Sequence, residues 1–190
     1  MNRYETWFCG TRLWRWMTRR QVLPWVLQGS QLGEHVLELG AGPGVATEEL
    51  ARLAGRVTSL EYDHAFAAKL GVRFNGSNAT AIQGDASTLP FADRTFSSAI
   101  AVLMLHHLRS SGLQDRAFAE IWRVLRPGGV FLAVEIPDGW LHRAGHIKST
   151  FVPVMPASAF ARLTAVGFSK VTVDFRRGGF RIRALRAREA

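Results

Sequence analysis

The most specific pattern in the sequence is a glycine-rich segment, residues 38–44, which reads ELGAGPG. It ends an apolar run at residues 35–39 and precedes a segment whose leucines have helical spacing. Glycines there allow a tight turn and the close approach of a ligand, and the free N–H groups of a following helix attract anionic groups. A dinucleotide-binding fingerprint would place its third glycine at position 45, which is Val45. The carboxylate of Glu38 would repel a phosphate, so the segment predicts a cofactor with a cationic end.

Two further acidic residues stand where predicted strands end. Residues 56–61 read as a strand that finishes in Glu61, and residues 79–83 read as a strand followed by Asp85. Open parallel sheets bind ligands at the carboxyl ends of their strands. The two acceptor oxygens of a carboxylate suit a vicinal diol, and a carboxylate can also accept from an exocyclic amine. Taken singly, Glu61 is a surface acid at a strand end and Asp85 a turn residue; their common placement favours a ligand site.

A second group of polar residues follows the next two predicted strands, at residues 96–103 and 130–136. His106 and His107 come after the first, and Glu135 lies near the end of the second. A histidine there could act as a general base, because its ordinary pKa lies near neutrality; a structural imidazole bonded to backbone is the alternative. Glu135 would position a substrate hydroxyl or amine, or face solvent. These three residues are the predicted catalytic candidates, and no metal site is predicted.

The order of the elements predicts the fold class. Apolar, β-branched runs alternate with helix-like segments, such as residues 45–54, 65–70 and 115–125, which is typical of an α/β fold with a doubly wound parallel sheet. Near the end, residues 171–176 and 181–186 are joined through Arg-Gly-Gly, which predicts an antiparallel hairpin at one edge of the sheet.

Four parts of the sequence, taken in order, together resemble motifs of the class I S-adenosylmethionine (SAM) dependent methyltransferases. Residues 38–44 resemble the first motif of that family, Glu61 falls where it has the acid that binds the ribose, residues 84–86 resemble its adenine-binding segment, and residues 120–129 resemble its helix and turn before strand five. The segment Leu-His-His-Leu at 105–108 is similar to the small-molecule branch, which includes the quinone-biosynthesis C-methyltransferases.

The resemblance implies a Rossmann-like sheet of seven strands, SAM as the cofactor with S-adenosylhomocysteine as its product, and a small-molecule methyl acceptor. It implies a set of cofactor-binding residues: Glu38, Gly40, Ala41, Gly42, Gly44, Glu61, Tyr62, Asp85, Ala86 and Met104. It disfavours a nucleic-acid substrate, because the Asn/Asp-Pro-Pro-aromatic motif of the amino-methylating enzymes is absent after the fourth strand. The alternatives are a non-catalytic SAM-binding module and, less favoured, an NAD(P)-binding oxidoreductase.

The segments outside the shared pattern predict how the substrate is covered. Residues 1–32 form an aromatic, helical lid segment, residues 33–190 the methyltransferase domain, and residues 137–156 an insert that covers the substrate. Trp14 and Trp16, set among arginines, favour either a packed lid or peripheral contact with a membrane, which would suit a hydrophobic acceptor.

Composition bounds these alternatives. The 190 residues are 47% hydrophobic and 21% charged, which fits one globular domain. A single cysteine, Cys9, excludes an internal disulfide and a thiolate cluster. The net charge of +9 lies mostly outside residues 36–135, which hold nine basic and ten acidic residues. With no secretory signal or long apolar run, we expect a cytoplasmic protein; an oligomeric state is not predicted.

Overall fold

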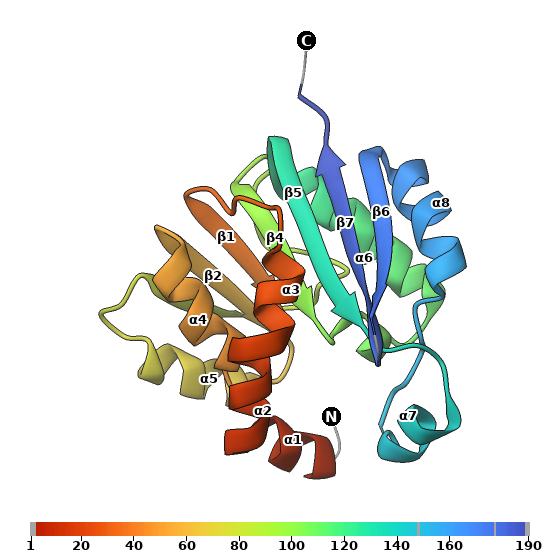
Figure 1. Ribbon diagram of the computed structural model, residues 1–190. Helices are drawn as coiled ribbons and strands as arrows, with labels where there is room; N and C mark the ends of the chain where they lie inside the picture. The colour runs from red at the N-terminus through yellow and green to blue at the C-terminus, as the bar shows by residue number, and fades with distance from the viewer. Residues whose placement is uncertain (1–2, 148, 177, 189–190) are drawn as a thin grey trace.

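Seven strands form one sheet in the computed structural model, which describes residues 3–147, 149–176 and 178–188. The strand order is β3-β2-β1-β4-β5-β7-β6 (Figure 1). The strands are β1 His35–Leu39, β2 Arg56–Glu61, β3 Ala79–Gln83, β4 Phe96–Val102, β5 Leu125–Glu135, β6 Phe168–Arg176 and β7 Gly179–Arg186. Strands β1 to β5 pair in parallel, whereas β7 is antiparallel to both of its neighbours, β5 and β6. The predicted α/β class, with seven strands and an antiparallel hairpin at one edge, is confirmed.

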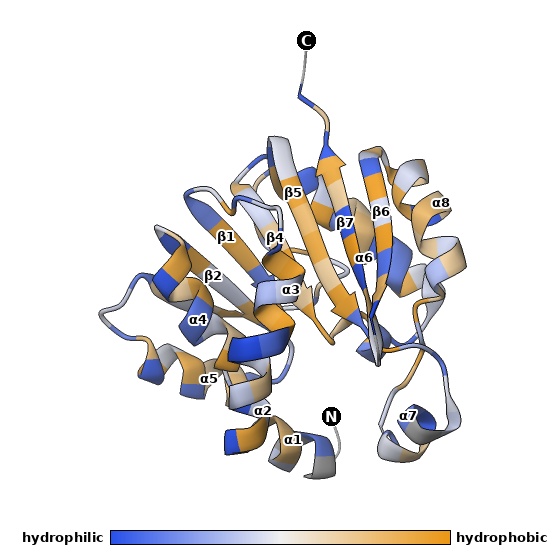
Figure 2. Ribbon diagram, viewed as in Figure 1, coloured by the Kyte–Doolittle hydropathy of each residue, from blue (hydrophilic) through white to orange (hydrophobic). Residues whose placement is uncertain are grey.

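Helices cover both faces of the sheet, because its central strands are apolar on both sides (Figure 2). Leu39 and Ile100, on neighbouring strands, are fully buried on opposite faces of the sheet. One face packs against α3 Leu23–Leu27, α4 Val45–Leu53 and α5 His64–Arg73, and the other against α6 Ser111–Val124 and α8 Pro156–Val166. This arrangement leaves the carboxyl edge of the parallel strands uncovered by these helices.

The N-terminal helices lie over that carboxyl edge (Figure 1). Helices α1 Arg3–Cys9 and α2 Arg12–Met17 are followed by a π-helical turn, η1 Thr18–Val22, which leads directly into α3. Arg15 and Arg19 pair with Glu48 of α4, at 3.2 and 2.6 Å, so these two arginines attach the segment to the domain. In the described part of the chain no helix combines the length and the apolar character that a membrane crossing requires.

Two predicted segments differ in kind from the structure, and several other elements differ from their predicted bounds by a few residues at their ends. The segment at 126–129, predicted to be a turn, belongs to β5, which begins at Leu125 with a shift in its register against β4; Gly128 has a φ of +83° there. The segment at 137–156, in which no period is visible, contains α7 Trp140–Gly145. Six residues are less than two helical turns, too few for a hydrophobic period to be recognised.

Candidate active site

A single cavity of about 1040 Å³ joins the two groups of residues that the sequence singled out. The glycine-rich segment, Glu61 and Asp85 line one part of it, and His106, His107 and Glu135 line another. Its remaining walls come from α1, α2, η1 and the segment after α7, which lies beside the N-terminal helices at the same end of the molecule (Figure 1). The cavity is large enough for a cofactor together with a small second molecule.

The glycine-rich segment is folded by glycines in the left-handed region. Gly40, with a φ of +73°, directs its N–H to the Leu60 carbonyl at 2.8 Å. Any Cβ on Gly40 would collide with the side chain of Met104. Gly44, with a φ of +78°, is the N-cap residue directly before α4. Gly42, in contrast, has nothing within 4 Å of where a Cβ would stand, so the segment is open on that side.

Glu61 is held rigidly beside this segment. Its Oε2 accepts the Gly42 N–H at 2.7 Å, and its Oε1 accepts the Asp63 N–H at 2.9 Å. The residue is 9% exposed and lines the cavity. Because each carboxylate oxygen has two lone pairs, both oxygens keep capacity for a further donor. The backbone therefore orients a carboxylate that can bind a pair of hydroxyls.

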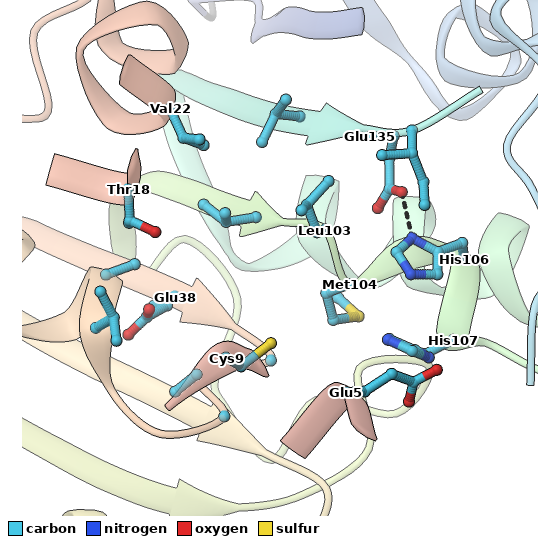
Figure 3. Close-up of a pocket in the computed structure, with 18 of the residues that line it drawn as sticks. Glu5, Cys9, Thr18, Val22, Glu38, Leu103, Met104, His106, His107 and Glu135 are labelled. Atoms are coloured by element: carbon cyan, nitrogen blue, oxygen red, sulfur yellow. Dashed lines mark hydrogen bonds and ion pairs between the residues drawn. The ribbon is translucent and has the colours of Figure 1, made fainter. Parts of the chain in front are cut away.

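Glu38 lies beneath the glycine-rich segment and is buried at 2% exposure (Figure 3). Its Oε2 accepts hydrogen bonds from the hydroxyls of Thr47, at 2.5 Å, and Ser59, at 2.6 Å. Burial raises the pKa of Glu38, and these two hydrogen bonds offset part of that rise. A buried carboxylate without a basic side chain bonded to it stabilises a cationic group placed in the cavity.

This burial predicts how stability depends on pH. Because the pKa of Glu38 is higher in the folded than in the unfolded protein, stability is greatest below the ordinary glutamate value and falls as pH rises through the raised one. Glu38→Gln is expected to raise the melting temperature at neutral pH, with a difference that vanishes near about pH 4.3. Calorimetry of the cofactor-free protein at several pH values, with exposed Glu34→Gln as the control, measures this. A Glu38→Gln variant that is less stable at every pH would contradict it.

The other predicted cofactor residues lie around the same part of the cavity. Asp85 Oδ1 accepts from both the N–H and the hydroxyl of Ser87, each at 2.8 Å. Ala86 is buried next to it, Tyr62 is 65% exposed at the rim, and Met104 packs under Gly40. The structure therefore brings nine of the ten predicted residues to the wall of one cavity, whereas Gly44 packs against Leu70 and Phe74 and does not line it. Contacts of these residues with a cofactor stay a prediction.

Two of the predicted catalytic residues, His106 and Glu135, form a buried hydrogen-bonded pair, and the third, His107, lies next to His106. Glu135 is fully buried, and its Oε2 lies 2.5 Å from His106 Nδ1 (Figure 3). Its Oε1 accepts the Leu105 N–H at 2.7 Å. The alternative of a solvent-facing Glu135 is therefore wrong. His107 donates from Nδ1 to the Thr150 carbonyl at 3.2 Å, and burial, with the nearby His106, lowers the pKa of His107 to about 4.

Sequence reasoning missed two residues of this cavity. Glu5 of α1 is 8% exposed, accepts a hydrogen bond from the Ser149 hydroxyl, and faces His107 (Figure 3). Thr18 opens the π-helical turn, and its buried hydroxyl has no hydrogen-bond partner among the described residues. Such turns are frequent at functional sites, but no local pattern marks one in the sequence. His146, in the segment after α7, lies next to His106, with their Nε2 atoms 3.2 Å apart.

Comparison with known proteins agrees with this geometry. The family described as a methyltransferase domain matches residues 37–133, about half of the chain. The chain belongs to this family. The matched part of the methyltransferase domain begins in β1 and ends in β5, and it contains the glycine-rich segment, Glu61, Asp85 and both histidines of the 105–108 segment.

The methyltransferase domain has curated relatives and solved structures of similar fold. The demethylmenaquinone methyltransferase of Corynebacterium kroppenstedtii is 35% identical over 119 residues, which are 62% of this chain and 45% of the relative. The chain spans about half the length of the curated relatives it matches.

Two solved structures show the same fold. A chain from the complex between the Haloferax volcanii Trm112 methyltransferase activator and a methyltransferase has a TM-score of 0.79, with 17% identity over 98% of this chain and 99% of that one. A SAM-dependent methyltransferase of Methanosarcina mazei has a TM-score of 0.72, with 22% identity over 87% of this chain and 98% of that one.

Proposed function

We propose that this protein binds SAM and transfers its methyl group to a small-molecule acceptor. The observation that carries the proposal is the single cavity in which a backbone-oriented carboxylate, Glu61, and an open glycine-rich segment share a wall with the His106–Glu135 pair. Family membership supports the same reaction class. A sulfonium cofactor needs a site without excess positive charge, and the buried Glu38 meets that need.

Different residues in the cofactor part of the cavity would bind different parts of SAM. Bound SAM supplies a methyl group activated by its positively charged sulfur. Glu38 and the segment at 40–44 would hold the amino-acid end, Glu61 the two ribose hydroxyls, and Asp85 with Ala86 the adenine. The lone pairs that Glu61 retains and the free space beside Gly42 fit this assignment.

Transfer of the methyl group depends mainly on the alignment of the acceptor atom, the methyl carbon and the sulfur. The acceptor atom forms a bond to the methyl carbon while the carbon–sulfur bond breaks, and the sulfur leaves as a neutral thioether. Walls that hold the two reactants in line and exclude water supply most of the rate enhancement. Where the acceptor must lose a proton, His106 or His107 is the candidate base, and Glu135 positions His106; these roles stay predictions.

We propose that the acceptor is hydrophobic. Trp14, Met17, Val22 and Trp25 line the cavity from the N-terminal helices, and Leu103 lines it from the position directly after β4. Apolar walls of this kind bind an apolar or aromatic molecule, and the demethylmenaquinone methyltransferase relative supports the same class. Residues 1–32 and 137–156 would then select the acceptor as cover segments of the domain.

A cytoplasmic location with peripheral membrane contact belongs to this proposal. Leu13 and Trp16 are 58% and 53% exposed, which supports contact with a membrane surface. Arg15 and Arg19 are engaged by Glu48, so two of the basic groups of the segment serve packing. The membrane contact stays a prediction.

Thermal unfolding with added ligand tests the cofactor assignment. S-adenosylhomocysteine at 100 times its dissociation constant is expected to stabilise the protein by ~2.7 kcal/mol, which raises the melting temperature by roughly 5–10 °C for a chain of this size. NADH at the same concentration is the control and should give no shift. A shift with NADH alone would overturn the proposal in favour of the oxidoreductase alternative.

Turnover then separates an enzyme from a binding module. Incubation with SAM and a demethylated quinone with a short side chain should yield S-adenosylhomocysteine and methylated quinone in equal amounts. Binding of the cofactor without turnover of any small hydrophobic acceptor would favour the non-catalytic module.

A further inference from the structure

Three imidazoles converge at the acceptor end of the cavity. His106 and His107 belong to the 3-10 turn η2 Leu105–His107 after β4, and His146 follows α7. One ring nitrogen from each lies within 4.8 Å of the others, and the Nε2 atoms of His106 and His146 are only 3.2 Å apart. Phe151 packs against the rings of His106 and His146, so one side of the cluster is apolar.

The opposite nitrogen of each ring is bonded to an acceptor outside the cluster. His106 Nδ1 lies 2.5 Å from Glu135 Oε2, His107 Nδ1 lies 3.2 Å from the Thr150 carbonyl, and His146 Nδ1 lies 2.6 Å from the His142 carbonyl. Carbonyl and carboxylate oxygens only accept, so each Nδ1 carries the proton. In the neutral imidazole the Nε2 atom then carries an unprotonated lone pair.

The lone pairs of His106 and His146 therefore face a common centre, and a ring nitrogen of His107 lies within 4.8 Å of the ligand atoms of these two residues. Two Nε2 lone pairs that face each other at 3.2 Å repel unless a cation lies between them. A carboxylate also lies beside these nitrogens: Glu5 Oε1 is 3.6 Å from His146 Nε2. Ligands bound at 2.0–2.1 Å to a tetrahedral zinc ion lie about 3.4 Å from one another. Both separations, 3.2 and 3.6 Å, are close to that edge length.

We propose that His106, His107 and His146 bind a divalent transition-metal ion of the zinc type through their Nε2 atoms, with the Glu5 carboxylate as the fourth ligand. Imidazole nitrogens with one carboxylate oxygen are a donor set that suits zinc. The Nδ1 partners are the second shell that metal-binding histidines need, since a carboxylate or carbonyl on the other nitrogen fixes the ring and its tautomer.

The ion would join three separate parts of the chain. It would connect α1 and the segment after α7 to the turn that follows β4, and these two segments form the walls of the acceptor end. An ion at this centre would engage the lone pairs that a general base needs, so metal binding by His106 and His107 excludes the service of either as a free base. The metal site does not depend on methyl transfer, because its residues are distinct from the cofactor set.

Metal binding by the 190-residue chain without a histidine tag tests the proposal. Equilibrium dialysis against Zn²⁺ should find one ion per chain. His146→Ala and His107→Ala should each weaken binding by more than the roughly 10–100-fold that a second-shell change costs, and Glu135→Gln should fall within that range. His64→Ala, at an exposed position on α5, is the matched control and should bind as the wild type does.

Cobalt substitution reads the coordination directly. Co²⁺ should give the intense visible absorption of a tetrahedral ion, Zn²⁺ should displace it, and His146→Ala should lack it, whereas His146→Cys should restore binding with a thiolate ligand. Absence of stoichiometric binding by the wild type, or binding that His107→Ala and His146→Ala leave unchanged, would overturn the proposal.

Two further measurements keep the outcome decisive. If His146→Ala fails to fold, the imidazole ¹⁵N resonances of the wild type decide, because Zn²⁺ should shift the Nε2 signals of three histidines. Protonated Nε2 signals that Zn²⁺ does not change would mean that a shared proton bridges the rings, against the proposal. Binding of S-adenosylhomocysteine to the wild type is measured in parallel. A wild type that binds zinc but does not bind S-adenosylhomocysteine would overturn the proposed function and leave the metal site standing.

Discussion

Glu61→Ala is expected to weaken the binding of S-adenosylhomocysteine about 100-fold or more, the largest effect on affinity that a single substitution in this cavity should have. Hydrogen bonds to a charged group contribute about 1.5–3 kcal/mol each, and the carboxylate would bind two ribose hydroxyls. The loss of both is therefore about 3 kcal/mol at least, and each 1.4 kcal/mol is about tenfold in affinity. Removal of the carboxylate also frees the N–H groups of Gly42 and Asp63 that it orients. Titration calorimetry with the purified variant measures the change.

The control for Glu61→Ala is the neighbouring Asp63→Ala. Asp63 caps α5 by accepting the N–H groups of Ala65 and Phe66, and loss of such a cap costs about 1 kcal/mol of stability. Because Asp63 does not hold the glycine-rich segment through its side chain, its variant should bind S-adenosylhomocysteine within a few-fold of the wild type. A folded Glu61→Ala variant that keeps its affinity would show that Glu61 is not the diol-binding acid.

Most of the sheet could be predicted because its elements are encoded locally. The predicted bounds of the first three strands, 35–39, 56–61 and 79–83, coincide with β1, β2 and β3. Each run and the glycine, acid or turn that closes it stand next to one another in the sequence, so the bounds can be predicted locally although the strands pair with distant partners. The cofactor residues follow from the same logic, because parallel strands bring their carboxyl ends to one edge wherever each strand lies in the sequence.

The histidine cluster could not be predicted in the same way. Glu5 and His146 lie far apart in sequence and meet only because α1 and the segment after α7 fold over the same edge of the sheet. Neither segment has a hydrophobic period that fixes its direction, since each helix there is seven residues or fewer. The spacing of His106 and His107 predicts two imidazoles at a strand end, but their shared centre depends on the tertiary placement of the third.

The burial of Glu38 is a further feature of the structure that the sequence pattern does not predict. Its position before the glycine-rich segment predicts a carboxylate near a cationic ligand, and the structure places it one layer below that segment, bonded to Thr47 and Ser59. The central place of β1 sets this depth, because every residue of that strand is buried between two layers of helices. A charge at this depth acts on the cavity through the field it creates as well as through contact.

The glycines at 40 and 42 should separate folding from binding. Gly40→Ala adds a Cβ that collides with Met104 at a φ of +73°. Backbone strain of about 1–2 kcal/mol and overpacking of about 1–3 kcal/mol should together lower the melting temperature by roughly 5–15 °C, since each 1 kcal/mol shifts it by about 2–4 °C.

Gly42→Ala is the matched variant, because its φ of +51° imposes a similar strain while its Cβ meets nothing within 4 Å. It should lose only about 1–2 kcal/mol of stability, yet its methyl group would stand in the space proposed for the cofactor. We therefore expect Gly42→Ala to lose more affinity for S-adenosylhomocysteine than Gly40→Ala loses when that variant is measured well below its melting temperature. Thermal unfolding and titration calorimetry of both variants give the two quantities. Equal losses of affinity, or a Gly42→Ala variant with wild-type affinity, would place the cofactor elsewhere in the cavity, because of these two glycines only Gly42 borders open space.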